Sequence, residues 1–310
     1  MVEVLDAVSA FLDRLTSVHP LPAALAVTAH LSRLAATSTA WRNVLAAAYP
    51  NVRVPRTKIL GAYVAGVGVN ALVPIRAGDA VRIALAHRAI PGSTYTTVVS
   101  TNLVLSIFDL AAAGALLAWA AATQDLPGID VLPDLRTFDY SWPFANPLPS
   151  ELALAALLVG GVVLGIWIHR HVLDFWERVR QGFTVMRTPS RYFRTVVPWQ
   201  AADWALRFVT IWLLLDAFDV DQSLRNVLLV QVSSTLSTLV PVTPSGIGTE
   251  QALLVYLFAG SVAASELLAF SVGTKLTLGA TNVVAGFVAI LLTLRTVRFG
   301  RALRSPDRLT

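Results

Sequence analysis

Two interrupted hydrophobic stretches decide the fold of this chain. The first, Asn70–Asp79, has the sequence NALVPIRAGD, and the second, Ser237–Glu250, has the sequence STLVPVTPSGIGTE. Each runs from Leu-Val-Pro through small or polar residues to a glycine and then to a carboxylate. Proline and glycine leave backbone polar groups unpaired, and a membrane tolerates such groups only where protein or a water-filled cavity meets them. The matching pair predicts a binding site between two internal repeats.

The composition around these stretches is that of an integral membrane protein. Hydrophobic residues make up 55% of the chain and charged residues only 14%, whereas a soluble domain carries about 25% charged residues. The formal net charge of +5 does not indicate a nucleic-acid partner, because the basic residues sit beside hydrophobic segments, where they set orientation. The chain has no cysteine, which excludes disulfides and thiolate metal sites. We expect no metal and no cofactor.

The hydrophobic pattern predicts an all-α polytopic membrane protein with about six full spans and two re-entrant broken-helix hairpins. The span-like runs include Leu21–Trp41, Thr96–Ala122, Leu152–Ile168, Trp199–Leu215 and Leu267–Leu294. A spanning helix needs about 20 apolar residues, and the Ile59–Ile75 run is shorter and interrupted by glycines. Basic residues flank that run on both sides, so the first hairpin is expected to enter from the cytoplasm.

Counting the loops onward from the first hairpin predicts an inverted-topology repeat within a single membrane domain, residues 1–310. The second hairpin then enters from the outer side, and a basic tail places the C-terminus in the cytoplasm of a bacterial cytoplasmic membrane. The divisions are repeat 1 at about 21–122, a connector at 123–198, repeat 2 at about 199–294 and a tail at 295–310. If Ile59–Ile75 crosses the membrane fully, the opposed orientation is lost. The residues expected to break the hairpins are Asn70, Pro74, Gly78, Pro241, Pro244, Gly246 and Gly248.

Three charged residues beside the first break form a candidate anion site. Arg76, Asp79 and Arg82 are spaced three residues apart, so they share one face of a helix. Asp79 can neutralise one arginine, and the other can meet a phosphate with its planar fork. The alternative is a basic anchor at the cytoplasmic end of a helix.

Three more charges lie in or beside apolar segments. Glu250 opens the helix after the second break, and Lys275 and Asp109 sit inside apolar runs. A charge in the bilayer centre is expensive and is expected to be paired or to face water. These residues are substrate-binding candidates. The alternatives are a helix-start acid at Glu250 and structural bridges that join Lys275 to Glu250 or Asp109 to Arg76.

One further pair of charges is expected to satisfy itself. Asp203 and Arg207 are four residues apart, so they can neutralise each other near the cytoplasmic interface. No nucleophile or metal-ligand cluster is visible, and no catalytic residue is assigned.

These motifs resemble the flippase-like membrane region of the lysylphosphatidylglycerol synthase family. The resembling pieces are Asn70-x-x-x-Pro74-x-Arg76-x-Gly78-Asp79-x-x-Arg82, Asp109, Pro241-x-x-Pro244-Ser245-Gly246-Ile247-Gly248-x-x-Glu250, and Lys275 with Gly279. The chain departs from the family pattern at Asp79, Ser245 and Lys275, where glutamate, glycine and arginine are common. No soluble aminoacyl-transferase domain is expected after Thr310. The resemblance therefore implies translocation of a lipid head group rather than its synthesis.

We thus expect a protein without enzymatic activity that moves a phospholipid or a polyprenyl-phosphate-linked lipid between leaflets. Two alternatives stay open at this point. The first is an intramembrane enzyme that modifies a lipid head group with the same carboxylates, and the second is a non-transporting partner of a cell-envelope glycosyltransferase. The oligomeric state does not follow from the sequence.

Overall fold

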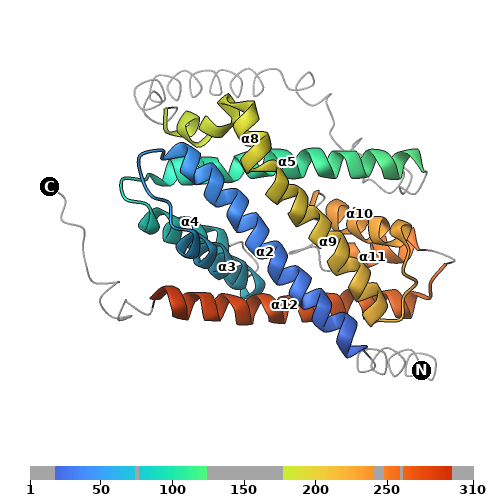
Figure 1. Cartoon of the computed structure of the whole chain (residues 1–310). Coiled ribbons are helices and arrows are strands. Elements are labelled where there is room, and N and C mark those ends of the chain that lie inside the picture. Colours follow the sequence, from blue (N-terminus) through green and yellow to red (C-terminus); the bar gives the residue numbers. More distant parts are fainter. Residues whose placement is uncertain (1–17, 74–76, 124–176, 240–247, 259–260, 295–310) are drawn as a thin grey trace, which may run out of the picture.

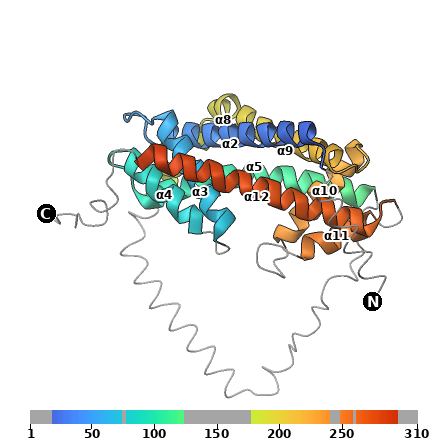
Figure 2. The same cartoon turned by 90° about the horizontal axis from the view of Figure 1, so that it is seen from below.

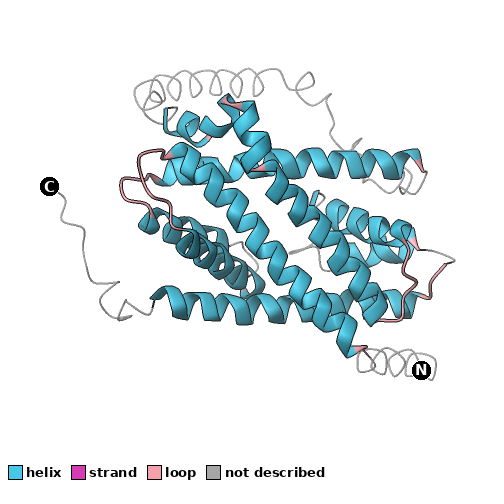
Figure 3. Cartoon of the chain, in the orientation of Figure 1, coloured by secondary structure: helices cyan, strands magenta, loops and turns pink. Residues whose placement is uncertain are grey.

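The computed structural model describes residues 18–73, 77–123, 177–239, 248–258 and 261–294, and all regular structure in these ranges is helical (Figure 3). This confirms the predicted all-α class. The helices are α2 (Pro20–Ala48), α3 (Arg56–Leu72), α4 (Ala77–Ala89), α5 (Tyr95–Ala122), the 3-10 helix η3 (Thr184–Arg187), α8 (Pro189–Thr195), α9 (Val197–Ala217), α10 (Leu224–Leu239), α11 (Thr249–Leu257) and α12 (Ala264–Leu294). The predicted span Leu152–Ile168 and the tail 295–310 lie outside the described residues.

Two long antiparallel helices, α2 and α9, form one face of the bundle (Figures 1 and 2). At one end, the His19 backbone amide before α2 donates to the Ala217 carbonyl of α9 at 3.0 Å. At the other end, the Asn43 side-chain amide of α2 donates to the Thr195 carbonyl before α9 at 2.7 Å. Behind this face, the hairpins α3–α4 and α10–α11 lie at opposite ends, and α5 and α12 run along the two sides (Figure 1).

Each hairpin is built on an apolar cluster at the C-terminal end of the long helix before it. The cluster under α3–α4 contains the fully buried Trp41, Ile59 and Val98. The cluster under α10–α11 contains the buried Leu214 and Leu254. Many van der Waals contacts between such closely packed side chains add up to a substantial attraction between helices in a membrane, so these two clusters hold the hairpins at the two ends of the molecule.

Glycines let the backbones of the first hairpin and its neighbour approach closely. A Cβ on Gly66 of α3 would lie 2.6 Å from the Gly78 carbonyl of α4. A Cβ on Gly68 would lie 2.6 Å from the Gly286 Cα of α12. Small residues permit this kind of close packing between helices in membranes, and they hold α3 against both α4 and α12.

Large apolar side chains point outward from the bundle. Leu110 on α5 is 67% exposed and Phe287 on α12 is 62% exposed. Polar side chains are buried inside, and these include Thr97, Ser100, Thr101, Gln200, Gln231, Ser233 and Ser271. An apolar exterior over a polar interior suits a lipid environment, because lipid can cover apolar surface that water would not.

Two described helices are long and apolar enough to cross a membrane, namely Tyr95–Ala122 and Ala264–Leu292. Helices α2 and α9 match the predicted spans Leu21–Trp41 and Trp199–Leu215 in position, but they do not reach that hydropathy because both carry charged side chains. The predicted number of about six spans therefore stays a prediction.

Candidate functional site

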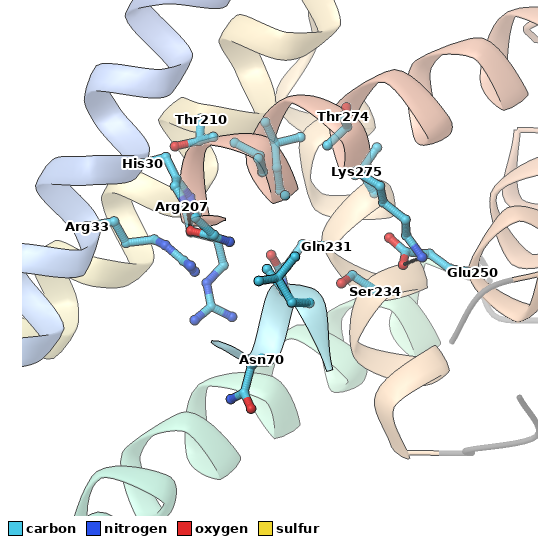
Figure 4. A pocket seen from close by; sticks show the side chains of 17 residues that line it. His30, Arg33, Asn70, Arg207, Thr210, Gln231, Ser234, Glu250, Thr274 and Lys275 are labelled. Atoms are coloured by element: carbon cyan, nitrogen blue, oxygen red, sulfur yellow. Dashed lines mark hydrogen bonds and ion pairs between the residues drawn. The ribbon is translucent and has the colours of Figure 1, made fainter. Parts of the chain in front are cut away.

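A cavity of about 570 Å³ lies between the long helices and the ends of the two hairpins. It is lined from α2, α3, α9, α10, α11 and α12, so both halves of the chain contribute (Figure 4). Its polar lining consists of His30, Arg33, Asn70, Arg207, Thr210, Gln231, Ser234, Glu250, Thr274, Lys275 and Asn282. Residues from both halves of the chain thus line one cavity, and its role as a binding site stays a prediction.

Two arginines that share one carboxylate occupy one side of this cavity. Asp203 of α9, whose side chain is 7% exposed, lies 3.0 Å from Arg207 Nη2 and 3.9 Å from Arg33 Nε. The Thr37 hydroxyl donates to Asp203 Oδ1 at 2.6 Å. Arg207 also lies 4.7 Å over the ring of Trp204, a cation–π contact that orients it further. Both arginines line the cavity, whereas Asp203 is not among the lining residues.

The opposite side of the cavity carries an ion pair between α11 and α12. Lys275 Nζ lies 2.9 Å from Glu250 Oε2, and the two side chains are 33% and 17% exposed. The structural bridge considered for these two residues is therefore present. The Ser233 hydroxyl of α10 donates to the Glu250 carbonyl at 2.9 Å, which ties the start of α11 to its partner helix. Gly248, just before α11, has a φ of 90°, a backbone conformation that favours glycine.

Asn70 connects the cavity to the charged residues of the first hairpin. Its side-chain oxygen accepts from the Gly78 amide at 2.8 Å, and its amide donates to Asp79 at 3.0 Å. Asp79 in turn lies 3.3 Å from Arg82, whose guanidinium carbon is 5.9 Å from the Trp41 ring centre. Asp79 and Arg82 thus join α3, α4 and α2 beside the cavity, and they are not among its lining residues. Their role in substrate binding stays a prediction.

Asp109 also lies away from the cavity lining. It is exposed on α5 and accepts a hydrogen bond from Trp204 Nε1 at 3.0 Å. Its bridge to Arg76 is untested, because Arg76 lies outside the described ranges, as do several other residues singled out from the sequence. The others are Pro74, Pro241, Pro244 and Gly246.

Arg33 and Arg207 are the residues that our sequence reasoning missed. Arg207 was assigned only to a local pair with Asp203, and that pair is present. Arg33 comes from α2, and the antiparallel packing of α2 on α9 brings it to the same carboxylate. A signal was available, because Arg33 is a charge within a predicted span and such charges face a partner or a cavity.

An apolar exterior and a cavity lined by charged side chains are typical of a helical integral membrane protein. The chain belongs to the family of the lysylphosphatidylglycerol synthase TM region, whose model matches residues 4–303. This confirms the resemblance seen in the motifs and connects the chain with a function that involves membrane lipid. Searches of the curated proteins and of the solved structures found no match.

Proposed function

We propose that this protein moves a lipid between the two leaflets of a bacterial cytoplasmic membrane, with the head group passing through the cavity and the acyl chains staying in lipid. One observation supports this proposal above the others. Arg33, Arg207 and Lys275 bring three cationic groups to one cavity inside a bundle whose outer surface is apolar. Arginine suits the phosphate of a lipid head group, because its planar fork binds two oxygens.

In the proposed function, the two hairpins are re-entrant elements. Each half of the chain has the order long helix, hairpin and long helix, with α2–α5 in the first half and α9–α12 in the second. The hairpins lie at opposite ends of the bundle (Figure 1), as inverted-topology repeats would place them if each hairpin entered from its own side of the membrane. In this proposal the C-terminus is cytoplasmic, the repeats are 21–122 and 199–294, and residues 123–198 connect them.

The proposal assigns no catalytic step and no obligatory protein partner. A head-group-modifying enzyme or a non-transporting partner of a glycosyltransferase would also bind lipid. Neither would change the leaflet distribution of a chemically unaltered lipid, and that difference is what the first experiment measures.

The first experiment compares lipid movement in proteoliposomes. A phospholipid with a fluorescent acyl chain is added to both leaflets, and a membrane-impermeant quencher reports the fraction exposed outside over time. We expect the wild-type protein to bring inner-leaflet lipid to the outer leaflet faster than protein-free vesicles do. The variant that combines Arg33→Gln with Arg207→Gln is expected to fall to the protein-free rate, because its cavity has lost both guanidinium groups.

The matched control is Arg88→Gln, because Arg88 is exposed on α4 and lies outside the cavity lining. This variant is expected to keep the wild-type rate. A wild-type protein that elutes as a folded species from size exclusion and yet leaves the rate of empty vesicles unchanged would contradict the proposed function.

A second experiment tests the opposed hairpins. The chain has no cysteine, so single cysteines can be labelled without background. Asn51→Cys lies exposed in the loop at the open end of the α3–α4 hairpin, and Ala263→Cys lies exposed at the open end of the α10–α11 hairpin. With oriented vesicles and an impermeant maleimide, we expect the two positions to be labelled from opposite sides. Labelling of both from the same side would refute the inverted repeat.

A further inference from the structure

We propose that the cavity selects a lipid phosphodiester that carries one net negative charge and a neutral, hydroxyl-bearing head group, such as glycerol or a sugar. This inference rests on the proposed function and specifies the substrate class of the same site. It follows from the balance of charges in the cavity, from a buried hydroxyl that lacks a hydrogen-bond partner, and from the ion pair with Lys275 that already occupies Glu250, the one carboxylate among the described lining residues.

The charge balance of the cavity favours a monoanion. Among the described residues, Arg33, Arg207 and Lys275 face the cavity, and the carboxylates that pair with them are Asp203 and Glu250. Three cations against two carboxylates leave an excess of one positive charge when His30 is counted as neutral. A phosphodiester supplies one negative charge, so its binding neutralises the site.

The excess charge is concentrated on the arginine side of the cavity. Arg33 and Arg207 share the single carboxylate of Asp203, whereas Lys275 has Glu250 to itself at 2.9 Å. Arg33 Nε lies 3.9 Å from Asp203, beyond hydrogen-bond distance, so the shared carboxylate holds Arg33 less closely than it holds Arg207. Phosphate oxygens match the fork of each guanidinium. The phosphate therefore belongs between Arg33 and Arg207.

The other polar groups of the lining are neutral, and they stand among apolar side chains such as Leu72, Ile211 and Val230. Asn70, Gln231, Ser234 and Asn282 supply amides and a hydroxyl, and they lie on α3, α10 and α12. Thr274 Oγ1 of α12 is buried and is also without a hydrogen-bond partner in the described ranges. Figure 4 shows Thr274 on the Lys275 side of the cavity, away from the two arginines. Such groups can donate to and accept from the hydroxyls of a neutral head group.

An amine-bearing head group finds no vacant partner in this lining. Glu250 is the one carboxylate among the described lining residues, and Lys275 already occupies it. The ammonium of a zwitterionic lipid would therefore have to displace Lys275. A head group with net positive charge would in addition meet the excess cationic charge, which is electrostatically unfavourable.

The test measures binding of short-chain lipids to the full-length protein in detergent, by the lipid-dependent shift of its thermal unfolding. The probes are dioctanoyl phosphatidylglycerol, phosphatidylethanolamine and phosphatidylmethanol, which share a phosphodiester. We expect the glycerol lipid to bind at least about tenfold more tightly than the ethanolamine lipid, because the ammonium of the ethanolamine lipid would have to displace Lys275 from Glu250, whereas the glycerol hydroxyls can pair with neutral polar groups of the lining. The methanol lipid, which has the charge but no hydroxyl, is expected to bind between the two.

Two variants assign this preference to the residues named above. Arg207→Gln is expected to remove the advantage of the glycerol lipid over the ethanolamine lipid, and Arg88→Gln is expected to retain it. Thr274→Val keeps the size of the side chain and removes its hydroxyl, so we expect it to reduce glycerol-lipid affinity to that of the methanol lipid while leaving methanol-lipid affinity unchanged. Equal wild-type affinity for the glycerol and ethanolamine lipids would overturn the inference.

The same probes separate this inference from the proposed function. In the proteoliposome assay, transport of all three lipids at one rate would overturn the selectivity and leave translocation standing. Selective binding of the glycerol lipid by a protein that never changes its leaflet distribution would support the selectivity and refute translocation.

Discussion

Replacing Asp203 with asparagine is expected to lower the stability of the protein by about 3 kcal/mol and to abolish lipid movement. Asparagine keeps the shape of the side chain and can still accept from the Thr37 hydroxyl, which lies 2.6 Å away. It removes the one carboxylate that Arg33 and Arg207 share, so two neighbouring guanidinium groups are left without a counter-charge. Thermal unfolding in detergent measures the first effect and the leaflet assay measures the second.

Added anion provides an internal check on this prediction. Because inorganic phosphate can replace the lost carboxylate between the two arginines, it should stabilise Asp203→Asn more than it stabilises the wild type. The matched control is Asp216→Asn, which removes an exposed carboxylate from the same helix and is expected to unfold at the wild-type temperature. If Asp203→Asn also unfolded at that temperature, the carboxylate would not be what holds the arginines together.

Substituting valine for Gly78 is expected to disrupt the first hairpin. A Cβ at this position would overlap the Gly66 carbonyl and would lie 2.7 Å from Asn70 Oδ1. Neither contact can be relieved by a small side-chain movement. The Gly66 carbonyl belongs to the backbone of α3, and Asn70 accepts a hydrogen bond from the Gly78 amide itself. Overpacking that forces backbone shifts typically costs about 1–3 kcal/mol, and the overlap with backbone at this position favours the upper end of that range. We expect Gly78→Val to elute largely as aggregate and the remainder to unfold at a lower temperature.

Gly114→Val separates this effect from the general consequences of replacing a helical glycine. Gly114 is exposed in the middle of α5, and no atom lies within 4 Å of the place where its Cβ would be. This variant should fold and transport as the wild type does. Wild-type behaviour of Gly78→Val would show that α3 and α4 do not approach as closely as the structure indicates.

The elements of the fold could be predicted closely from the sequence. The run predicted at Thr96–Ala122 is α5 at Tyr95–Ala122, and the run predicted at Leu267–Leu294 is α12 at Ala264–Leu294. Such runs and the proline and glycine breaks between them are local features, so they can be recognised without knowledge of what packs against them. The pairing of Lys275 with Glu250 could also be predicted from the sequence, because an isolated charge in an apolar run needs a partner.

Which residues line the cavity could not be predicted in the same way. Arg82 shares its spacing with Asp79, yet its guanidinium packs by Trp41 and Tyr63 rather than in the cavity lining. Asp109 is as isolated in sequence as Lys275, yet it lies exposed on α5 beside Trp204. Spacing along a helix indicates which residues share a face, but the direction of that face depends on how the helix is rotated against its neighbours.

The sequence by itself determined that this is a helical membrane protein with two interrupted hairpins, because hydrophobic runs and the residues that break them act within one segment. The tertiary structure alone decided that Arg33 and Arg207 meet at Asp203 and face the cavity together. Arg33 and Asp203 are 170 positions apart, and they meet because α2 and α9 pack antiparallel along their length. An electrostatic site made by two such helices exists only once their register and rotation are set by packing.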